Sequence, residues 1–149
     1  MKEETLELRR AQEADLPAIR ALLESCSLPT GDLAESLPGS FCIGEVDGEI
    51  VGVSGVEMFG SNGLLRSLAV APPRRGRGLA ARLVDWCEDQ ARRDRVTALY
   101  LLTTTAADYF RRRGYDDVPR ESAPASISGH PQFRGLCPAS AKCLRKQLT

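Results

Sequence analysis

The sequence of 149 residues lacks several features that would place it in a specialised class of protein. No apolar run reaches the roughly 18 residues that a membrane-spanning helix needs. The first residues, Met1–Glu4, are acidic overall, and no apolar segment of a secretory leader follows them. The net charge is zero, from 20 Lys and Arg against 20 Asp and Glu, whereas nucleic-acid-binding domains are usually strongly basic. We therefore expect a cytoplasmic protein with neither a membrane nor a nucleic acid as partner.

Cysteine and histidine are too few and too widely spaced for a typical metal centre. Among the five cysteines, Cys137 and Cys143 lie six positions apart, and no C-x-x-C pair occurs. An odd number of cysteines without metal spacing favours reduced thiols. The single histidine, His130, lies between glycine and proline, and we interpret it as a residue of a surface turn. We expect no bound metal.

Hydrophobic periodicity predicts one α/β domain over residues 1–149, with a mixed central sheet of about six to seven strands flanked by about four helices. Strands are predicted over residues 5–10, 40–46, 49–59, 64–70, 96–102 and 141–148. Helices are predicted over residues 13–25, 32–37, 78–94 and 106–113. The nearly continuous apolar run at 96–102 is typical of a central buried strand. Asp47-Gly48 indicates a two-residue hairpin turn.

The most informative segment is a turn rich in glycine and arginine between a predicted strand and the long predicted helix. Residues 68–80 read Leu-Ala-Val-Ala-Pro-Pro-Arg-Arg-Gly-Arg-Gly-Leu-Ala. The prolines end the strand, and the glycines let backbone N–H groups approach an anion closely. The first turn of the helix adds N–H groups without intrahelical acceptors and the positive end of the helix dipole. The segment therefore predicts a site for a small anion such as a pyrophosphate.

Two known phosphate-binding loops fit this segment poorly. A Walker A loop ends in Gly-Lys-Ser/Thr, and the corresponding residues here are Gly78-Leu79-Ala80. The dinucleotide fingerprint matches as Gly76-x-Gly78-x-x-Ala81, but five residues separate the strand from Gly76, and the next strand ends without an acidic residue. A solvated basic turn that only caps the helix stays open as an alternative.

The segment resembles the acetyl-CoA signature of the GNAT superfamily of N-acetyltransferases. Arg75-Gly-Arg-Gly78-Leu-Ala80 has the form Q/R-x-x-G-x-G/A. The later segment Ala106-x-x-Tyr-Phe-x-x-x-Gly114-Tyr is similar to the helix that lies beside the pantetheine arm in that family. The order of predicted elements agrees with the family along nearly the whole chain. The resemblance implies an N-acetyltransferase with acetyl-CoA as co-substrate.

The resemblance also implies which residues bind the cofactor. In the family, the strand before the loop carries a bulge whose backbone groups meet the acetyl carbonyl and the pantetheine amides. These positions correspond here to Leu68, Ala69 and Val70. The pyrophosphate would lie on the backbone N–H groups of Arg75, Gly76, Arg77, Gly78, Leu79 and Ala80.

The acid and base residues depart from the family's pattern. The usual glutamate on the third of these strands is not evident, because Leu65 and Arg66 occupy that region. Glu57, on the preceding strand, is the candidate base, directly or through water; the alternative is an outward-facing strand residue. The family's acid tyrosine lies four residues before the glycine, where this chain has Phe110. Tyr109, about 100° away around the helix, is the candidate acid; the alternative is an ordinary aromatic.

Because the sequence offers few candidate acid and base residues, it favours an acceptor amine that loses its proton easily. An α-amino group, with a pKa of about 7.7–8.0, is neutral in roughly one molecule in eight at pH 7, against about one in 2,500 for a lysine side chain near 10.4. We therefore expect a small amino acid, or a toxic amino-acid analogue, as acceptor. Arg66 is the candidate group that binds its carboxylate or acidic head, unless Arg66 is a structural ion-pair partner.

Three further segments, Gly63–Val70, Leu101–Ala106 and Gln132–Ala141, are similar to the small N-acetyltransferases of bacterial arsenic-resistance clusters. Those enzymes are relatives of the acetyltransferases that modify phosphinothricin and arsinothricin. The alternative to an enzyme is a non-catalytic sensor on the same fold, which binds acetyl-CoA or, through its thiols, a metalloid. Strands at the edge of the sheet are compatible with a homodimer.

Overall fold

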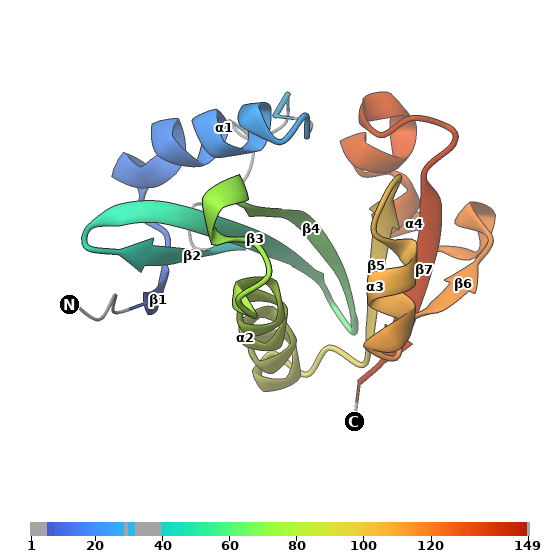
Figure 1. Ribbon diagram of the computed structural model, residues 1–149. Helices are drawn as coiled ribbons and strands as arrows, with labels where there is room; N and C mark the ends of the chain where they lie inside the picture. Colours follow the sequence, from blue (N-terminus) through green and yellow to red (C-terminus); the bar gives the residue numbers. More distant parts are fainter. Residues whose placement is uncertain (1–5, 29, 32–39, 149) are drawn as a thin grey trace. The chain divides into compact units, whose positions relative to one another are not determined.

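The computed structural model describes residues 6–28, 30–31 and 40–148, so the helix predicted over 32–37 lies outside the described residues (Figure 1). The strands are β1 (Leu6–Arg10), β2 (Phe41–Val46), β3 (Glu49–Phe59), β4 (Asn62–Val70), β5 (Ala98–Thr103), β6 (Asp116–Val118) and β7 (Lys142–Gln147). The α-helices are α1 (Leu16–Ser25), α2 (Leu79–Arg93), α3 (Ala107–Arg112) and α4 (Ala125–Ser128). Shorter helical turns occupy Glu13–Asp15, Pro72–Arg74, Arg120–Ser122 and Gln132–Leu136.

In the described residues the strands form one sheet in the order β1-β2-β3-β4-β5-β7-β6. The pairing of β4 with β5 is parallel, whereas β1 with β2, β2 with β3, β5 with β7 and β6 with β7 are antiparallel. The predicted mixed α/β sheet is therefore confirmed, and so is the internal position of the strand in the 96–102 region. No helix in the described part of the chain is long and apolar enough to cross a bilayer.

The hairpin turn was predicted correctly, but two strands begin two residues away from their predicted starts. Asp47 and Gly48 have φ of 51° and 80°, as a two-residue turn with both φ values positive requires. β4 begins at Asn62, so Gly63 belongs to the strand, where a Cβ would come within 2.7 Å of Leu99. β5 begins at Ala98 because the N–H of Val96 bonds to the carbonyl of Ala91 and closes the end of α2.

Contacts between residues divide the chain into two compact units, of which the first is Met1–Gly55 with Ser67–Cys87. Here α1 packs on one face of the strands, and the start of α2 packs on the other (Figure 1). Gly44 and Gly52 let α2 approach closely, because a Cβ at these positions would lie 3.1 and 2.9 Å from Leu79 side-chain atoms. The buried residues are Ile19, Leu22, Leu23, Phe41, Ile43 and Val53 on the α1 face, and Cys42, Val46, Val51, Leu79 and Leu83 on the α2 face.

The second unit is Val56–Arg66 with Glu88–Thr149. Its apolar core joins β4 and β5 to β7 and α4, through Leu64, Ala98, Tyr100, Ala123, Ile127 and Cys143. A buried carboxylate, Glu88, is held by the hydroxyl of Tyr115 at 2.8 Å and by the ammonium of Lys146 at 3.0 Å. These two partners offset the cost of removing the Glu88 charge from water.

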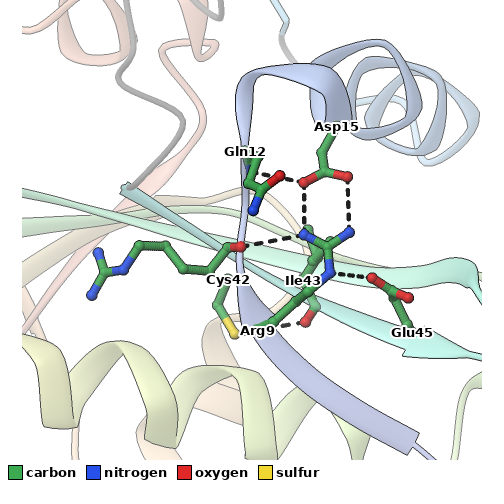
Figure 2. A network of polar contacts seen from close by, with 7 residues as sticks. Arg9, Gln12, Asp15, Cys42, Ile43 and Glu45 are labelled. Carbon is green, nitrogen blue, oxygen red and sulfur yellow. Dashed lines mark hydrogen bonds and ion pairs between the residues drawn. The ribbon is translucent and has the colours of Figure 1, made fainter.

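In the first unit, Arg9 lies between two carboxylates (Figure 2). Its Nη1 and Nη2 donate to Oδ2 and Oδ1 of Asp15 at 2.8 and 2.9 Å, and its Nε donates to Glu45. Asp15 also accepts the backbone N–H of Gln12 at 2.7 Å in the turn that precedes α1. The hydrogen bond from Arg9 is the main reason that the pKa of Asp15 lies below its usual value, although burial opposes the shift. This ion pair joins β1 to the start of α1.

We predict that Asp15→Asn lowers the free energy of unfolding at pH 7 by about 1–2 kcal/mol, because the variant loses charge-assisted hydrogen bonds. Since folding lowers the pKa of Asp15, this stabilisation is present above the unfolded pKa and is lost as the pH falls through the folded pKa. The difference from the wild type should therefore shrink below about pH 4. Urea unfolding at pH 7 and pH 3 measures it, with the exposed Glu13→Gln in the same turn as control. An equal difference at both pH values would contradict the assignment.

Candidate active site

The glycine- and arginine-rich turn joins the end of β4 to the start of α2 within the first unit. Pro72–Arg74 form a short helical turn after the strand, and α2 begins at Leu79. Gly76 and Gly78 both have φ of 80°, a left-handed conformation that residues with a Cβ rarely adopt. A Cβ at either position would meet no atom within 4 Å. The two glycines are therefore needed for the backbone conformation and leave the surface of the turn open.

The turn gathers donors of hydrogen bonds and positive charge. The N–H groups that precede Arg82 in the first turn of α2 have no acceptor within the helix. Arg75 is fixed at the turn, because its Nε donates to the carbonyl of Val70 at 3.0 Å and its Nη2 lies 3.5 Å from Sγ of Cys26. A cavity of about 270 Å³ lies beside the turn and is lined by Leu6, Val46, Val51, Arg74, Arg77, Leu79 and Arg82. The turn thus has the donors and the charge that an anion-binding site requires.

Strand β4 is irregular just before the turn. Ser67 has φ of 58°, which is uncommon for a residue with a Cβ in the middle of a strand. Local distortions of this kind bend a strand and often lie beside functional sites. The segment Leu68–Val70, predicted to meet the acetyl and pantetheine groups, begins at the next residue. Leu68 is half-buried, whereas Ala69 and Val70 are buried. Their contact with a cofactor stays a prediction.

In the second unit, Glu57 of β3 lies between a guanidinium and an imidazole. Arg66 of β4 places Nη1 3.4 Å from Oε2 of Glu57, and His130 places Nε2 2.5 Å from the same oxygen. The Arg66 side chain is fully buried, whereas the Glu57 side chain keeps 19% of its surface exposed. Burial raises the pKa of Glu57, but the hydrogen bond from His130 and the charge of Arg66 outweigh it, so this pKa lies below its ordinary value. Glu57 is therefore an ionised carboxylate with access to solvent.

The interpretation of His130 as a surface turn residue is wrong. The residue is 8% exposed and follows α4, where the backbone N–H of Gln132 donates to its Nδ1 at 3.1 Å. Because Nδ1 accepts this bond, the neutral ring carries its hydrogen on Nε2, which donates to Glu57. The two residues lie 73 positions apart, and nothing local in the Gly-His-Pro segment indicates the contact.

Tyr109, the candidate acid, lies in α3 in the second unit. Its ring is half-buried and meets the edge of Phe110 with 5.2 Å between ring centroids, and the Arg113 guanidinium lies 6.0 Å from the Tyr109 ring. Phe110, at the family's usual tyrosine position, is buried against Tyr115 with 5.3 Å between centroids. Phe110 is therefore a core residue, and the acid role of Tyr109 stays a prediction.

The cysteines and acidic residues form no metal centre in the part of the chain that the structure describes, since no group of three His, Cys, Asp or Glu side chains is arranged to hold an ion. Burial raises the pKa of Cys42 to about 12 and that of Cys143 to about 11. These two thiols therefore stay protonated at neutral pH and are poor metal ligands.

The family model of the acetyltransferase (GNAT) family matches residues 5–115. The chain belongs to this family. This membership confirms the family that the sequence resembles, and the fold agrees with it. The glycine- and arginine-rich turn, Glu57 and Arg66 all lie within the matched residues, whereas His130 lies beyond them.

The chain is similar to enzymes that acetylate amino acids. Amino-acid acetyltransferases from two strains of Neisseria meningitidis are 27% identical over 131 residues, which are 83% of this chain and 30% of those proteins. N-acetylglutamate synthase from Neisseria gonorrhoeae, solved with CoA and N-acetylglutamate, has a TM-score of 0.84 and 26% identity over 99% of this chain and 36% of that chain. This chain therefore spans about a third of the length of these relatives.

A smaller protein of known structure shares the fold over nearly its whole length. Rv2747 from Mycobacterium tuberculosis, solved in complex with CoA, has a TM-score of 0.81 and 22% identity, over 96% of this chain and 99% of that chain. The GNAT fold of this chain thus also occurs as a protein of similar size.

We predict that Gly78→Val raises the Kd for acetyl-CoA at least tenfold, because the side chain narrows the approach to the backbone N–H groups and strains a positive φ. Gly48→Val is the matched control: Gly48 has the same φ of 80° and no neighbour within 4 Å, but lies in the β2–β3 hairpin. Both variants should lose a similar stability, about 1–2 kcal/mol. Isothermal titration calorimetry measures the Kd. Unchanged affinity in Gly78→Val, or an equal loss in Gly48→Val, would contradict the assignment of the turn.

Proposed function

We propose that this chain transfers the acetyl group of acetyl-CoA to the α-amine of a small amino acid with an acidic side chain, glutamate or an analogue of it. The observation that carries the proposal is the Glu57 carboxylate, which is ionised and partly exposed among buried partners. A fixed anion of this kind suits an acceptor that arrives as an ammonium ion and reacts as an amine. The similarity to amino-acid acetyltransferases supports the choice of acceptor.

In the proposed reaction, the neutral amine attacks the thioester carbonyl carbon, a C–N bond forms, and the C–S bond breaks to release the thiolate of CoA. The nitrogen gives up its second proton as the C–N bond forms, and Glu57 accepts it directly or through a water molecule. The thiolate takes up a proton, for which Tyr109 is the proposed donor; Glu57 then loses its proton to solvent, and Tyr109 regains one from solvent. The products are the N-acetylated amino acid and CoA, with one proton released from the original ammonium ion.

The turn in the first unit is proposed to hold the pyrophosphate of acetyl-CoA. Its N–H groups at Arg75–Ala80 supply the hydrogen bonds, and the partial positive charge of the α2 N-terminus favours the anion. The backbone of Leu68–Val70, which follows the irregular Ser67, is proposed to meet the pantetheine amides. No charged side chain has to move for these contacts, because the donors belong to the backbone.

Arg66 has two candidate roles, and its surroundings favour one of them. A fully buried guanidinium 3.4 Å from the Glu57 carboxylate suits the role of counter-charge, which keeps Glu57 ionised. Direct binding of the acceptor's acidic group requires an exposed guanidinium surface, which the Arg66 side chain lacks. We therefore propose Arg66 as the ion-pair partner of Glu57.

The resemblance to enzymes of arsenic-resistance clusters adds a finer proposal: the acceptor is a toxic analogue of glutamate, such as arsinothricin or phosphinothricin. Both carry the α-amine and α-carboxylate of glutamate and replace the side-chain carboxylate by another anionic group. Glutamate and its analogues can thus be acetylated by the same reaction, and recognition of the side-chain anionic group would determine which of them is the preferred acceptor.

The acceptor is tested by measuring thiol release from acetyl-CoA with glutamate, arsinothricin, phosphinothricin, neutral amino acids and a lysine-containing peptide. We expect kcat/KM for at least one acidic amino acid or analogue to exceed that for the lysine peptide by about 100-fold or more, because the proposed site takes a small α-amine rather than a side-chain amine of a peptide. Faster acetylation of the lysine peptide would refute the proposed acceptor. Tight binding of acetyl-CoA without turnover on any amine would favour the non-catalytic sensor.

Glu57→Gln tests the base. We expect kcat/KM for the best acceptor to fall by about 100-fold or more, the usual contribution of a general base, while the Kd for acetyl-CoA stays within about twofold. Glu49→Gln, at the exposed start of the same strand, is the matched control and should keep full activity. A rate within threefold of the wild type in Glu57→Gln would show that Glu57 is not the base.

A further inference from the structure

In the described part of the chain, two side chains contact the Glu57 carboxylate, and both contact the same oxygen. His130 donates to Oε2 at 2.5 Å, and Nη1 of Arg66 lies 3.4 Å from the same Oε2. Among the described residues, no side chain makes a hydrogen bond or ion pair with Oε1. The carboxylate is therefore held at one oxygen, and the other is left for an external partner.

His130 is itself held from two further sides. The backbone N–H of Gln132 donates to Nδ1 at 3.1 Å, which directs the hydrogen of the neutral ring to Nε2. Phe59 meets the ring edge-on, with 6.2 Å between centroids. Phe59 and Glu57 are two residues apart in β3 and therefore lie on the same side of the strand. The imidazole thus has one tautomer and one orientation, both directed at Glu57.

We propose that His130 is a positioning residue for Glu57: it fixes the carboxylate through Oε2, so that Oε1 meets the amine of the acceptor. The proposal rests on the proposed role of Glu57 as the base. His130 itself makes no contact with the reacting atoms and takes no proton in this scheme. Its ring hydrogen stays on Nε2. Proton transfer from the acceptor amine depends on the orientation of the Glu57 carboxylate, which His130 fixes. A misplacement of about 1 Å at such a group costs up to roughly 100-fold in rate.

Two substitutions separate positioning from packing. His130→Gln places a side-chain amide N–H close to the position of Nε2 and keeps the bond to Glu57, whereas the shorter His130→Asn reaches only as far as Nδ1. We expect kcat to fall at least tenfold in His130→Asn and to stay within about threefold in His130→Gln, with the KM for acetyl-CoA unchanged in both. Equal losses in the two variants, or full activity in His130→Asn, would overturn the proposal. Thermal unfolding shows whether each variant is folded at the assay temperature.

A double-mutant cycle shows whether His130 acts through Glu57. In the Glu57→Gln background, His130→Asn should lower kcat by less than twofold, because the group that it positions is already absent. A loss as large as in the wild-type background would mean that His130 acts independently. If Glu57→Gln alone is fully active, the proposed function fails at its base. If Glu57→Gln is impaired but His130→Asn is not, only the positioning role fails.

Nitrogen NMR of the untagged wild-type protein tests the same contact even if a His130 variant does not fold. His130 is the single histidine of the chain, so the imidazole signals belong to one residue. For the neutral ring we expect the hydrogen on Nε2 rather than on Nδ1, and a shift of the Nε2–H signal in Glu57→Gln. The Nδ1–H tautomer, or an Nε2–H signal unchanged in Glu57→Gln, would overturn the proposal.

Discussion

A carboxylate that is largely removed from water stays ionised only when hydrogen bonds and opposite charge replace its hydration. Glu57 satisfies this condition with one guanidinium and one imidazole, from β4 and from the segment after α4. Three stretches of the second unit, β3, β4 and the segment after α4, therefore meet at one oxygen atom of Glu57. Removing either partner leaves a half-buried charge with too little compensation, so the position of the carboxylate and the folding of these stretches are coupled.

In the turn before α2, the constraint is the direction of backbone N–H groups rather than the charge of a side chain. Its donors are backbone N–H groups, whose directions depend on φ and ψ, so the positive φ of Gly76 and Gly78 decides where they point. The Arg75 side chain ties the turn back to the last carbonyl of β4. The glycines, the backbone donors and the arginines of the turn thus all come from one continuous stretch of about a dozen residues.

Local patterns predicted most of the sheet and the long helix, because period-two and period-3.6 spacing of apolar residues reflects burial directly. Gly63 falls outside the strand predicted over 64–70, because a glycine indicates a turn in the sequence equally well where, as here, a neighbouring Leu99 leaves no room for a Cβ. The elements of residues 116–136 are three to five residues long, too short to show a period. Their positions depend on packing against β7 and the core around Ile127.

The glycine- and arginine-rich turn and the Glu57 cluster differ in the same way. The order and spacing of proline, arginine and glycine in residues 72–78 determined a turn with backbone donors and positive charge, since all of these arise within one stretch of sequence. The partners of Glu57 were decided only by the tertiary structure. From the sequence, Arg66 could equally bind a substrate or form an ion pair, and His130 was interpreted as a surface residue. In the structure both are buried beside the Glu57 carboxylate. Contact across 73 residues depends on how the strands and α4 pack, which no local pattern of residues encodes.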